Sequence, residues 1–370
     1  MLPKPCLPEL CIVIPVLNER DNIVPLVVAL QAALSGILWE ALFVDDDSQD
    51  GTREAIAAAA LEEPRLRLLH RIGRRGLASA FVEGAQASMA PVIAAMDADL
   101  QHDPGLLPQM LAAIRSCGCD VAVGSRYVAG GSIVDWDGGR AAMSHLATRL
   151  ARRLLRSPLH DPLSGYFMLR RSVFELAVRR LSCIGFKILL DILSSLPHPV
   201  RVRELPLAFA PRLAGHSKLG GGTVRDFGLL LAEKLLGPRL PVRLVLFALV
   251  GLGGLGVHGL ALYLAKNWLE LPFLNAQLMA TAIAIGSNFL LNNYLTFADR
   301  PRTGWNLLSG LLMFGLVCSV GALNNLGVAS LLLASEPQAW GLAGLAGGAM
   351  SLMWNYAVGS ALVWPVARAT

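Results

Sequence analysis

Acidic and amide side chains follow three apolar, strand-like segments near the start of the chain. They are Asn18 and Glu19 after CIVIPVL, Asp45, Asp46 and Asp47 at the end of EALFVDDD, and Asp97, Asp99 and Gln101 after VIAAM. Helix-like runs separate these segments, and such a βαβ order predicts a mostly parallel sheet. Ligands of these sheets bind at the carboxyl ends of the strands. We therefore expect the acidic groups to share one edge of the sheet and to form a site there.

Carboxylates gathered at one edge repel one another unless a cation or hydrogen-bond donors compensate. Carboxylate and amide oxygens favour a hard ion, Mg²⁺ or Mn²⁺, which keeps open positions for phosphate oxygens. A metal that holds a diphosphate neutralises charge on a departing nucleoside diphosphate, so the pattern suits a nucleotide-sugar enzyme. Any single cluster could instead be a turn or helix cap, as at Asp47 and Ser48 before Gly51. The sequence contains neither GxxxxGK[ST] nor a strand-linked GxGxxG, which excludes P-loop and dinucleotide sites on motif grounds.

Composition divides the chain into two parts. The 370 residues are enough for two to three domains, and 54% of them are hydrophobic while 16% are charged. Only six charged residues lie between Leu244 and Ala367. The formal charge of +5 comes without a dense basic run, so we expect anionic lipid or phosphate partners and no nucleic acid. The six cysteines form no CxxC pair and predict reduced thiols rather than a zinc site or disulfides.

Four charge-free stretches, at 244–265, 271–298, 303–335 and 337–367, are each long enough to cross a bilayer. Lys and Arg cluster before the first stretch, between the second and third, and after the fourth, whereas the opposite loops hold only Lys266. By the positive-inside rule, both termini and the N-terminal part are cytoplasmic. The first 19 residues do not resemble a signal peptide, which agrees with that orientation.

Two further features concern the junction and the spans. Segment 223–243 mixes apolar and charged residues at helical spacing and predicts a helix in the membrane interface, with an ordinary amphipathic core helix as the alternative. Asn288 and Asn292 share a helix face, and interhelical hydrogen bonding is preferred over a path for a polar headgroup.

Six ordered sequence blocks resemble the polyprenyl-phosphate glycosyltransferases, in particular the dolichol-phosphate mannose synthase group of the family-two glycosyltransferases. The blocks are PVLNE at 15–19, VDDDSQDGT at 44–52, DADLQHDP at 97–104, GSRY at 124–127, DPLSGYFMLRR at 161–171 and PRLAGHSKLG at 211–220. The last 125 residues or so resemble the four-span GtrA-like family. The resemblance implies a cytoplasmic α/β nucleotide-binding glycosyltransferase domain at 1–222, an interface helix and linker at 223–243, and a helical domain of four transmembrane helices at 244–370, in a prokaryotic inner membrane.

The same resemblance implies a metal-dependent, inverting transfer of mannose from GDP-mannose to dolichyl or polyprenyl phosphate. The donor would contact Pro15, Leu17, Glu19, Val44, Asp46, Asp97, Ala98, Asp99, Arg212 and Lys218. The acceptor phosphate would contact Arg126, Arg140 and Ser144, and the metal would be held by Asp99 and Gln101. Asp99, Arg126 and Arg140 are thus the implied catalytic residues. Family members often have Tyr where Leu17 stands, so we expect only a backbone contact there, and Asp191 stands where Glu is common.

A lipid phosphate monoester is already largely dianionic at neutral pH, because its second pKa is near 6, so this acceptor needs no general base. We expect one acceptor oxygen to attack the anomeric carbon opposite the nucleotide while arginines hold the phosphate. His102 is interpreted as solvated or as a helix cap rather than as catalytic. His216 adds at most a hydrogen bond beside the diphosphate.

Two alternatives stay open at this point. A UDP-sugar such as UDP-glucose could replace GDP-mannose, because pocket shape decides the donor. The chain could instead be a translocator of lipid-linked sugar whose N-terminal half is a docking module. A processive polysaccharide synthase is disfavoured because the chain has no Arg-Trp dipeptide. The sequence makes no prediction about oligomeric state.

Overall fold

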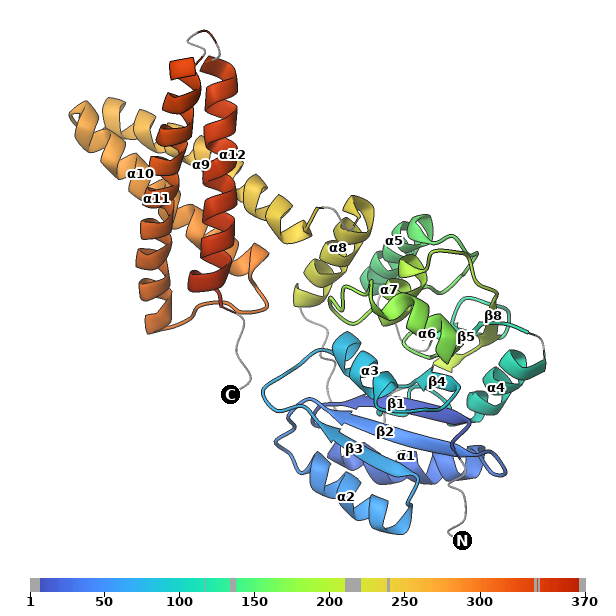
Figure 1. Cartoon of the computed structure of the whole chain (residues 1–370). Helices are drawn as coiled ribbons and strands as arrows, with labels where there is room; N and C mark the ends of the chain where they lie inside the picture. Colours follow the sequence, from blue (N-terminus) through green and yellow to red (C-terminus); the bar gives the residue numbers. More distant parts are fainter. Residues whose placement is uncertain are drawn as a thin grey trace. The chain divides into compact units, whose positions relative to one another are not determined.

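The computed structural model describes residues 7–116, 118–133, 138–209, 221–237, 240–335, 338 and 340–365, with the side chains of 133, 138–143, 145, 209, 221 and 223 outside the description. The chain forms two compact units, Met1–Leu235 and Leu236–Thr370. The first is an α/β unit and the second is helical (Figure 1). This division confirms an α/β domain followed by a helical membrane domain.

Within the described residues of the first unit, seven strands form one sheet in the order β3-β2-β1-β4-β7-β5-β8. The strands are β1 (Leu10–Val16), β2 (Trp39–Asp45), β3 (Leu66–His70), β4 (Val92–Ala95), β5 (Val121–Ser125), β7 (Phe167–Arg170) and β8 (Val202–Pro206). Only β7 is antiparallel to its neighbours, so the expected mostly parallel sheet is confirmed. A second small sheet pairs β6 (Ser132–Ile133) with β9 (Ala208–Phe209).

Helices cover both faces of the large sheet (Figure 1). One face packs against α1 (Arg20–Ala33), α2 (Thr52–Glu62), the short 3₁₀ helix η1 (Pro104–Leu106) and α4 (Leu107–Ser116). The other face packs against α3 (Leu77–Gln86), α6 (Arg171–Val178) and α7 (Ile188–Ser195). Because both faces are covered, the central strands are apolar on both sides, which explains the unbroken apolar runs. Gly84 lets α3 approach β1, since a Cβ there would lie 2.5 Å from Val13 Cγ1.

Helix α8 (Gly221–Leu236) packs on the first unit together with α5 (Gly138–Leu154). Leu230 of α8 is fully buried with Ala151 and Leu190. Lys234 Nζ lies 2.5 Å from Asp191 Oδ1; the Asp191 side chain is buried and that of Lys234 is mostly covered. Part of the amphipathic pattern of 223–243 therefore serves packing within this unit, which agrees with the alternative interpretation for that face of the helix.

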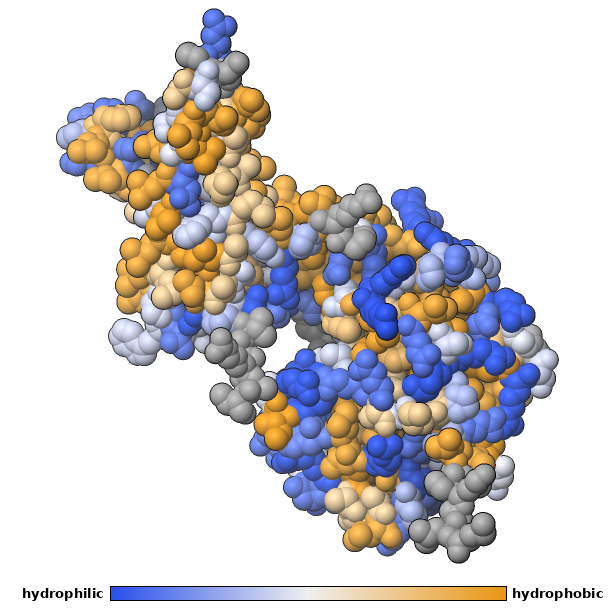
Figure 2. Space-filling view, in the orientation of Figure 1, coloured by the Kyte–Doolittle hydropathy of each residue, from blue (hydrophilic) through white to orange (hydrophobic). Residues whose placement is uncertain are grey.

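The second unit consists of long helices. They are α9 (Val242–Asn267), α10 (Phe273–Leu291) continuing into the π-helical turn η2 (Asn292–Thr296), α11 (Trp305–Ser335), and α12 (Trp340–Val358) continuing into the π-helical turn η3 (Gly359–Val363). Among the described residues, three helices are long and apolar enough to cross a membrane: α9, α10 with η2, and α11. The fourth stretch is helical, but four glycines, Asn355 and two tryptophans lower the mean hydropathy of α12. Figure 2 shows hydrophobic side chains over much of the visible surface of this unit. Leu312, Leu316 and Leu323 of α11 are exposed.

The second unit is built from two copies of one helical hairpin. The offset is 67 residues, which takes Phe273–Leu291 to Trp340–Val358 and Asn292–Thr296 to Gly359–Val363. Ring contacts exchange under the same offset, because Phe247 meets Tyr356 at 5.7 Å between centroids while Phe314 meets Phe289 at 6.0 Å. These exchanged contacts are those of two hairpins related by an approximate twofold axis.

Each hairpin is locked by an asparagine that lies against a glycine of the facing helix. A Cβ on Gly254 would lie 2.3 Å from Asn288 Oδ1, and a Cβ on Gly321 would lie 2.2 Å from Asn355 Oδ1. Neither oxygen has a conventional hydrogen-bond donor in the described part of the chain, so each rests against a glycine Cα–H. Asn288 thus contacts the facing helix without the expected interhelical hydrogen bond to its side-chain oxygen, and the amide of Asn292 donates within its own helix to Asn288 O at 2.9 Å.

Candidate active site

The predicted acidic residues meet at one edge of the sheet. Strands β2, β1 and β4 are adjacent and parallel, so their carboxyl ends lie side by side. Glu19 follows β1, Asp46 follows β2, and Asp97 and Asp99 follow β4. The sequence expectation that these groups share an edge is confirmed.

Hydrogen bonds join the loop after β1 to the loop after β2. The backbone N–H of Asn18 donates to Ser48 Oγ at 2.8 Å, and the N–H of Gln49 donates to Asn18 Oδ1 at 2.9 Å. The N–H of Glu19 donates to Thr52 Oγ1 at 2.9 Å. Asn18 has φ 53°, a left-handed conformation that asparagine tolerates well. Ser48 and Thr52 therefore position the first loop of the site, beyond serving as turn residues.

Asp46 is held by a buried arginine that sequence reasoning missed. Its Oδ1 accepts from Arg71 Nη1 at 2.5 Å, and its Oδ2 accepts from the Gly76 N–H at 2.7 Å. Arg71 is buried and also donates to Ser79 Oγ at 2.6 Å. Burial raises the pKa of Asp46, while these two partners favour its charged form. The charge of Asp46 is therefore compensated by protein groups, and each oxygen keeps a further lone pair for a ligand.

The loop after β4 is shaped by a buried histidine. The N–H of Asp97 donates to His102 Nδ1 at 3.0 Å, and the His102 ring stacks on Tyr166 with 4.8 Å between centroids. Burial lowers the pKa of His102 to about 4, so the ring is neutral at physiological pH with its proton on Nε2. The interpretation of His102 as a solvated side chain or helix cap was wrong, because the ring is a buried support for the Asp97 backbone.

Asp99 and Gln101 come together through a tight turn. Leu100 has φ 59°, and the Gln101 N–H donates to Asp99 Oδ1 at 3.2 Å. Within the described residues, no group of three His, Cys, Asp or Glu side chains could enclose a metal. Two oxygen-bearing side chains in one turn fit an ion that takes its remaining ligands from phosphates and water, as Mg²⁺ does.

Arg126 is fixed by a carboxylate from the DPLSGYF block. Its Nε and Nη2 donate to the two oxygens of Asp161, each at 2.8 Å, and Asp161 is completely buried. Arg126 sits directly after β5, and this bidentate pair sets the plane of its guanidinium group. Asp161 was not among the predicted site residues, although it begins one of the six blocks.

Lys187 adds a second cation beside this pair. Its Nζ donates to Leu163 O at 3.0 Å. Burial lowers the pKa of Lys187 to about 8, and the nearby charge of Arg126 contributes in the same direction, while Asp161 and Asp97 oppose it. Two cations thus lie near a carboxylate, Asp161, whose two oxygens are already bound by Arg126, and a phosphate ligand would be attracted to both cations.

The remaining acceptor-side residues are placed in part. Tyr127 Oη lies 3.1 Å from Ser144 Oγ, so α5 and the GSRY turn are in contact as the predicted acceptor site requires. Arg140 lies one turn before Ser144 on α5, and its side chain is outside the description. Arg212, His216 and Lys218 lie outside the described residues, so their predicted roles stay predictions.

Two of the other predicted donor residues, Val44 and Ala98, are buried, and two, Pro15 and Leu17, are partly exposed. Pro15 pairs with Val44 across β1 and β2. Val44 is fully buried in the core and Ala98 is 3% exposed, so any ligand contact there is through the backbone. Leu17 is partly exposed in the loop after β1.

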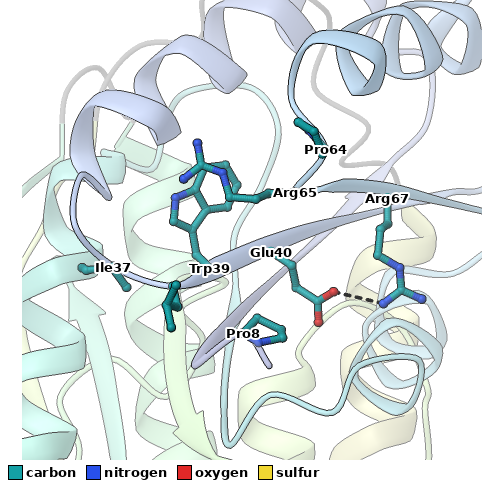
Figure 3. A pocket seen from close by; sticks show the side chains of 8 residues that line it. Pro8, Ile37, Trp39, Glu40, Pro64, Arg65 and Arg67 are labelled. Carbon is teal, nitrogen blue, oxygen red and sulfur yellow. Dashed lines mark hydrogen bonds and ion pairs between the residues drawn. The ribbon is translucent and has the colours of Figure 1, made fainter. Parts of the chain in front are cut away.

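A cavity of about 260 Å³ lies at the opposite end of the sheet, where β2 and β3 begin (Figure 3). The Arg65 guanidinium lies 4.2 Å from the centre of the Trp39 ring, and Arg67 pairs with Glu40 at 3.0 Å. Its charged groups are matched within the protein, and it contains none of the predicted site residues.

The chain matches two family models. Residues 11–176 match glycosyl transferase family 2, and residues 246–364 match the GtrA/DPMS transmembrane domain. A dolichol-phosphate mannosyltransferase from Pyrococcus furiosus is 35% identical over 319 residues, covering 86% of this chain and 88% of that protein. A polyprenol monophosphomannose synthase from Mycolicibacterium smegmatis is 33% identical over 228 residues, covering 60% of this chain and 85% of that protein.

Among solved structures, glucosyl-3-phosphoglycerate synthase from Mycobacterium tuberculosis aligns with a TM-score of 0.46 at 20% identity, covering 62% of this chain and 81% of that one. This alignment is too weak to bear on ligands. The match to the Pyrococcus protein is decisive, because its 319 residues are more than either unit contains and therefore span both. The chain therefore belongs to the dolichol-phosphate mannosyltransferase family of family 2 glycosyltransferases, in the form that carries a GtrA/DPMS transmembrane domain.

Proposed function

We propose that the protein transfers mannose from GDP-mannose to the phosphate of a dolichyl or polyprenyl lipid and so forms a lipid-linked phosphomannose. The observation that carries this proposal is the meeting of two kinds of group at one sheet edge. Carboxylates follow β1, β2 and β4, and the cation Lys187 lies near enough to Asp97 of that edge and to Arg126 to feel the charges of both. The first set suits a nucleotide sugar with its metal, and the second suits a phosphate acceptor.

The donor side favours a guanine base over uracil. Guanine presents two adjacent donors, N1–H and the N2 amine, whereas uracil presents a single N–H between two carbonyl oxygens. Asp46 has a lone pair left on each oxygen after its bonds with Arg71 and Gly76, so it can accept two donors at once. A base that leaves one of these carboxylate oxygens without a donor binds more weakly. This reasoning supports GDP-mannose over the UDP-sugar alternative.

On the acceptor side, the chain's task is to hold a dianion in line with the anomeric carbon. Arg126 is oriented by Asp161, Lys187 adds positive charge, and Ser144 and Arg140 bring groups from α5. The phosphate oxygen is already charged at neutral pH and needs no base. Asp99 and Gln101 would hold Mg²⁺ or Mn²⁺, which would supply charge neutralisation at the donor diphosphate. His102 keeps the Asp97 backbone in place and takes no proton, since it is neutral in this pH range.

We further propose four membrane spans, with the catalytic unit and both termini in the cytoplasm of a prokaryotic cell. The hairpin repeat supports the fourth span, because α12 with η3 corresponds residue for residue to α10 with η2, which is apolar enough to cross. The positions of Lys and Arg support the orientation. On α8, Val224 and Leu235 are exposed beside its packed face, which supports the proposed contact of 223–243 with the membrane interface.

Comparison of nucleotide affinities tests the assignment of GDP-mannose as the donor. GDP, IDP and UDP are titrated against the purified protein with Mg²⁺, by calorimetry. IDP lacks only the N2 amine of guanine, so we expect it to bind about tenfold more weakly than GDP, and UDP to bind more weakly still. In Asp46→Asn the difference between GDP and IDP should shrink. Equal affinity for GDP and UDP would rule out the guanine assignment.

A further inference from the structure

A small charged cluster in the membrane unit departs from the hairpin repeat. The packing residues obey the 67-residue offset, as Gly254 and Gly321 do. The cluster of Arg243, Asp299 and Arg300 does not, because the corresponding positions hold Gly310, Val366 and Ala367. The second helix of each hairpin has the same bounds under this offset although the second hairpin lacks these charges, so this helix forms without them. Residues that differ between the two hairpins at positions where the repeat is otherwise preserved are candidates for a functional role.

The cluster contains more positive than negative charge. Arg243 Nη2 pairs with Asp299 Oδ2 at 3.0 Å. Arg300 is close enough to interact electrostatically with Asp299, Arg243 and Tyr356. Its guanidinium carbon lies 5.4 Å from the centre of the Phe297 ring. Two guanidinium groups thus share one carboxylate. The cluster keeps one positive charge that the described residues nearby do not balance.

Two donors of Arg300 are buried and unsatisfied. Its Nε and Nη1 have no hydrogen-bond partner within the described part of the chain. The neighbouring Arg302 shows what a structural arginine does in this turn, since its Nε donates to Val363 O at 2.6 Å and its N–H to Asn293 Oδ1 at 2.8 Å. Buried donors in proteins are nearly always paired, so those of Arg300 call for an acceptor that the described residues do not supply.

We propose that Arg300, together with Arg243, binds a phosphate group carried by a lipid, at a site separate from the catalytic edge. A phosphate group offers several acceptor oxygens to the guanidinium donors and supplies the missing negative charge. The cluster lies at the ends of α9 and α10, where the proposed orientation puts lipid headgroups on the cytoplasmic side. The buried ring of Phe297 stacks on Tyr356 with 6.5 Å between centroids, so the turn that carries the cluster is anchored in the core of the helical unit. The two sources of this chemistry are the polyprenyl phosphate substrate and an anionic membrane lipid.

The test counts bound lipids on the full-length protein in detergent by native mass spectrometry. Polyprenyl phosphate, phosphatidic acid and phosphatidylcholine are titrated separately, with inorganic phosphate as competitor. The variants are Arg300→Gln, Arg300→Lys, and Lys266→Gln as a matched control that removes a cation from the opposite loop. Arg140→Gln is the background that weakens the proposed catalytic phosphate contact. Melting temperature in the same detergent reports folding, and Arg300→Lys keeps the test valid if Arg300→Gln does not fold.

In the Arg140→Gln background, we expect Arg300→Gln to weaken binding of a lipid phosphate by about tenfold or more, Arg300→Lys to weaken it less, and Lys266→Gln to leave it unchanged. A loss seen with polyprenyl phosphate alone identifies the substrate as the ligand, and a loss seen equally with phosphatidic acid identifies a membrane lipid. Unchanged affinity in both Arg300 variants, or equal binding of phosphatidylcholine, overturns the site. This test measures lipid binding and no turnover. Failure of the proposed mannosyl transfer would show instead in a product assay, as absence of product from a protein that still binds lipid through Arg300.

Discussion

Replacing Arg71 by Met should remove the partner of Asp46 and leave a buried carboxylate without its countercharge. The side chains of Arg71 and Asp46 are 2% and 9% exposed, and their closest atoms lie 2.5 Å apart. Breaking a buried ion pair by removing one member costs about 3–5 kcal/mol of stability. The matched control is Arg74→Met, because Arg74 pairs with Glu83 at 2.9 Å but is 57% exposed. A surface pair of that kind contributes about 0–1 kcal/mol.

The assay follows melting temperature and GDP affinity of both variants between pH 5 and 8. Burial already raises the pKa of Asp46, and loss of Arg71 raises it further. Arg71→Met should therefore melt well below Arg74→Met, and its GDP affinity should fall as the pH drops and Asp46 takes up a proton. Asp46→Asn combined with Arg71→Met should recover part of the melting temperature, because the uncompensated charge is gone. If Arg71→Met behaves like Arg74→Met in both measurements, the account of Arg71 as the support of Asp46 is refuted.

Three further predictions concern other parts of the chain. Gly254→Ala and Gly321→Ala should each destabilise the membrane unit by about 1–3 kcal/mol, because the new methyl group meets an asparagine side chain. The controls Gly253→Ala and Gly256→Ala place the methyl group in open space and should not destabilise it. Equal shifts in melting temperature for the four variants would contradict the Asn–Gly contacts. Burial lowers the pKa of His102 to about 4, so as the pH falls the unfolded state takes up a proton on this residue before the folded state does. The free energy of unfolding should therefore decrease as the pH falls from about 6.5 to 4. His102→Gln should lose this part of the pH dependence of the melting temperature. The pKa of Lys187 is lowered to about 8, so acceptor affinity should weaken above that pH, and Lys187→Arg should move the loss to higher pH; an unshifted profile would exclude Lys187 as a phosphate contact.

Local pattern was sufficient to predict the sheet and the edge that carries the site. Glu19, Asp46 and Asp99 each follow an apolar strand, and parallel strands bring such residues together whatever the details of packing. Charge-free stretches likewise located the four long helices. The apolarity of α12 was overestimated, because counting charges ignores its glycines, asparagine and tryptophans.

The partners of the site residues could not be predicted, because they come from distant segments. Arg71 lies 25 residues from Asp46, and Asp161 lies 35 residues from Arg126. A basic residue soon after β3 was the available signal for Arg71, but the sequence holds three arginines between 71 and 75 and pattern does not choose among them. His102 was misread because a histidine in a loop gives no sign that Tyr166 will cover it.

The hairpin repeat was invisible in sequence for a related reason. Positions that pack the two helices of one hairpin together keep their residue type, such as Asn288 and Asn355, while neighbouring positions differ, such as Leu290 and Ala357. Contacts that exchange under one offset revealed it. The same comparison separates residues that build the membrane unit from Arg300, which the hairpin does not need.

The central claim is that a mannosyl group moves onto a lipid phosphate. The most direct measurement incubates the purified full-length protein with Mg²⁺ or Mn²⁺, a polyprenyl phosphate, and separately GDP-mannose, UDP-glucose or UDP-N-acetylglucosamine, and identifies the lipid product by mass spectrometry. Asp99→Ala is the matched variant, which should lose metal-dependent turnover. We predict a mannosyl-phosphoryl-lipid from GDP-mannose alone. A product from a UDP-sugar would contradict the donor assignment, and no product from any donor would contradict the proposed activity itself.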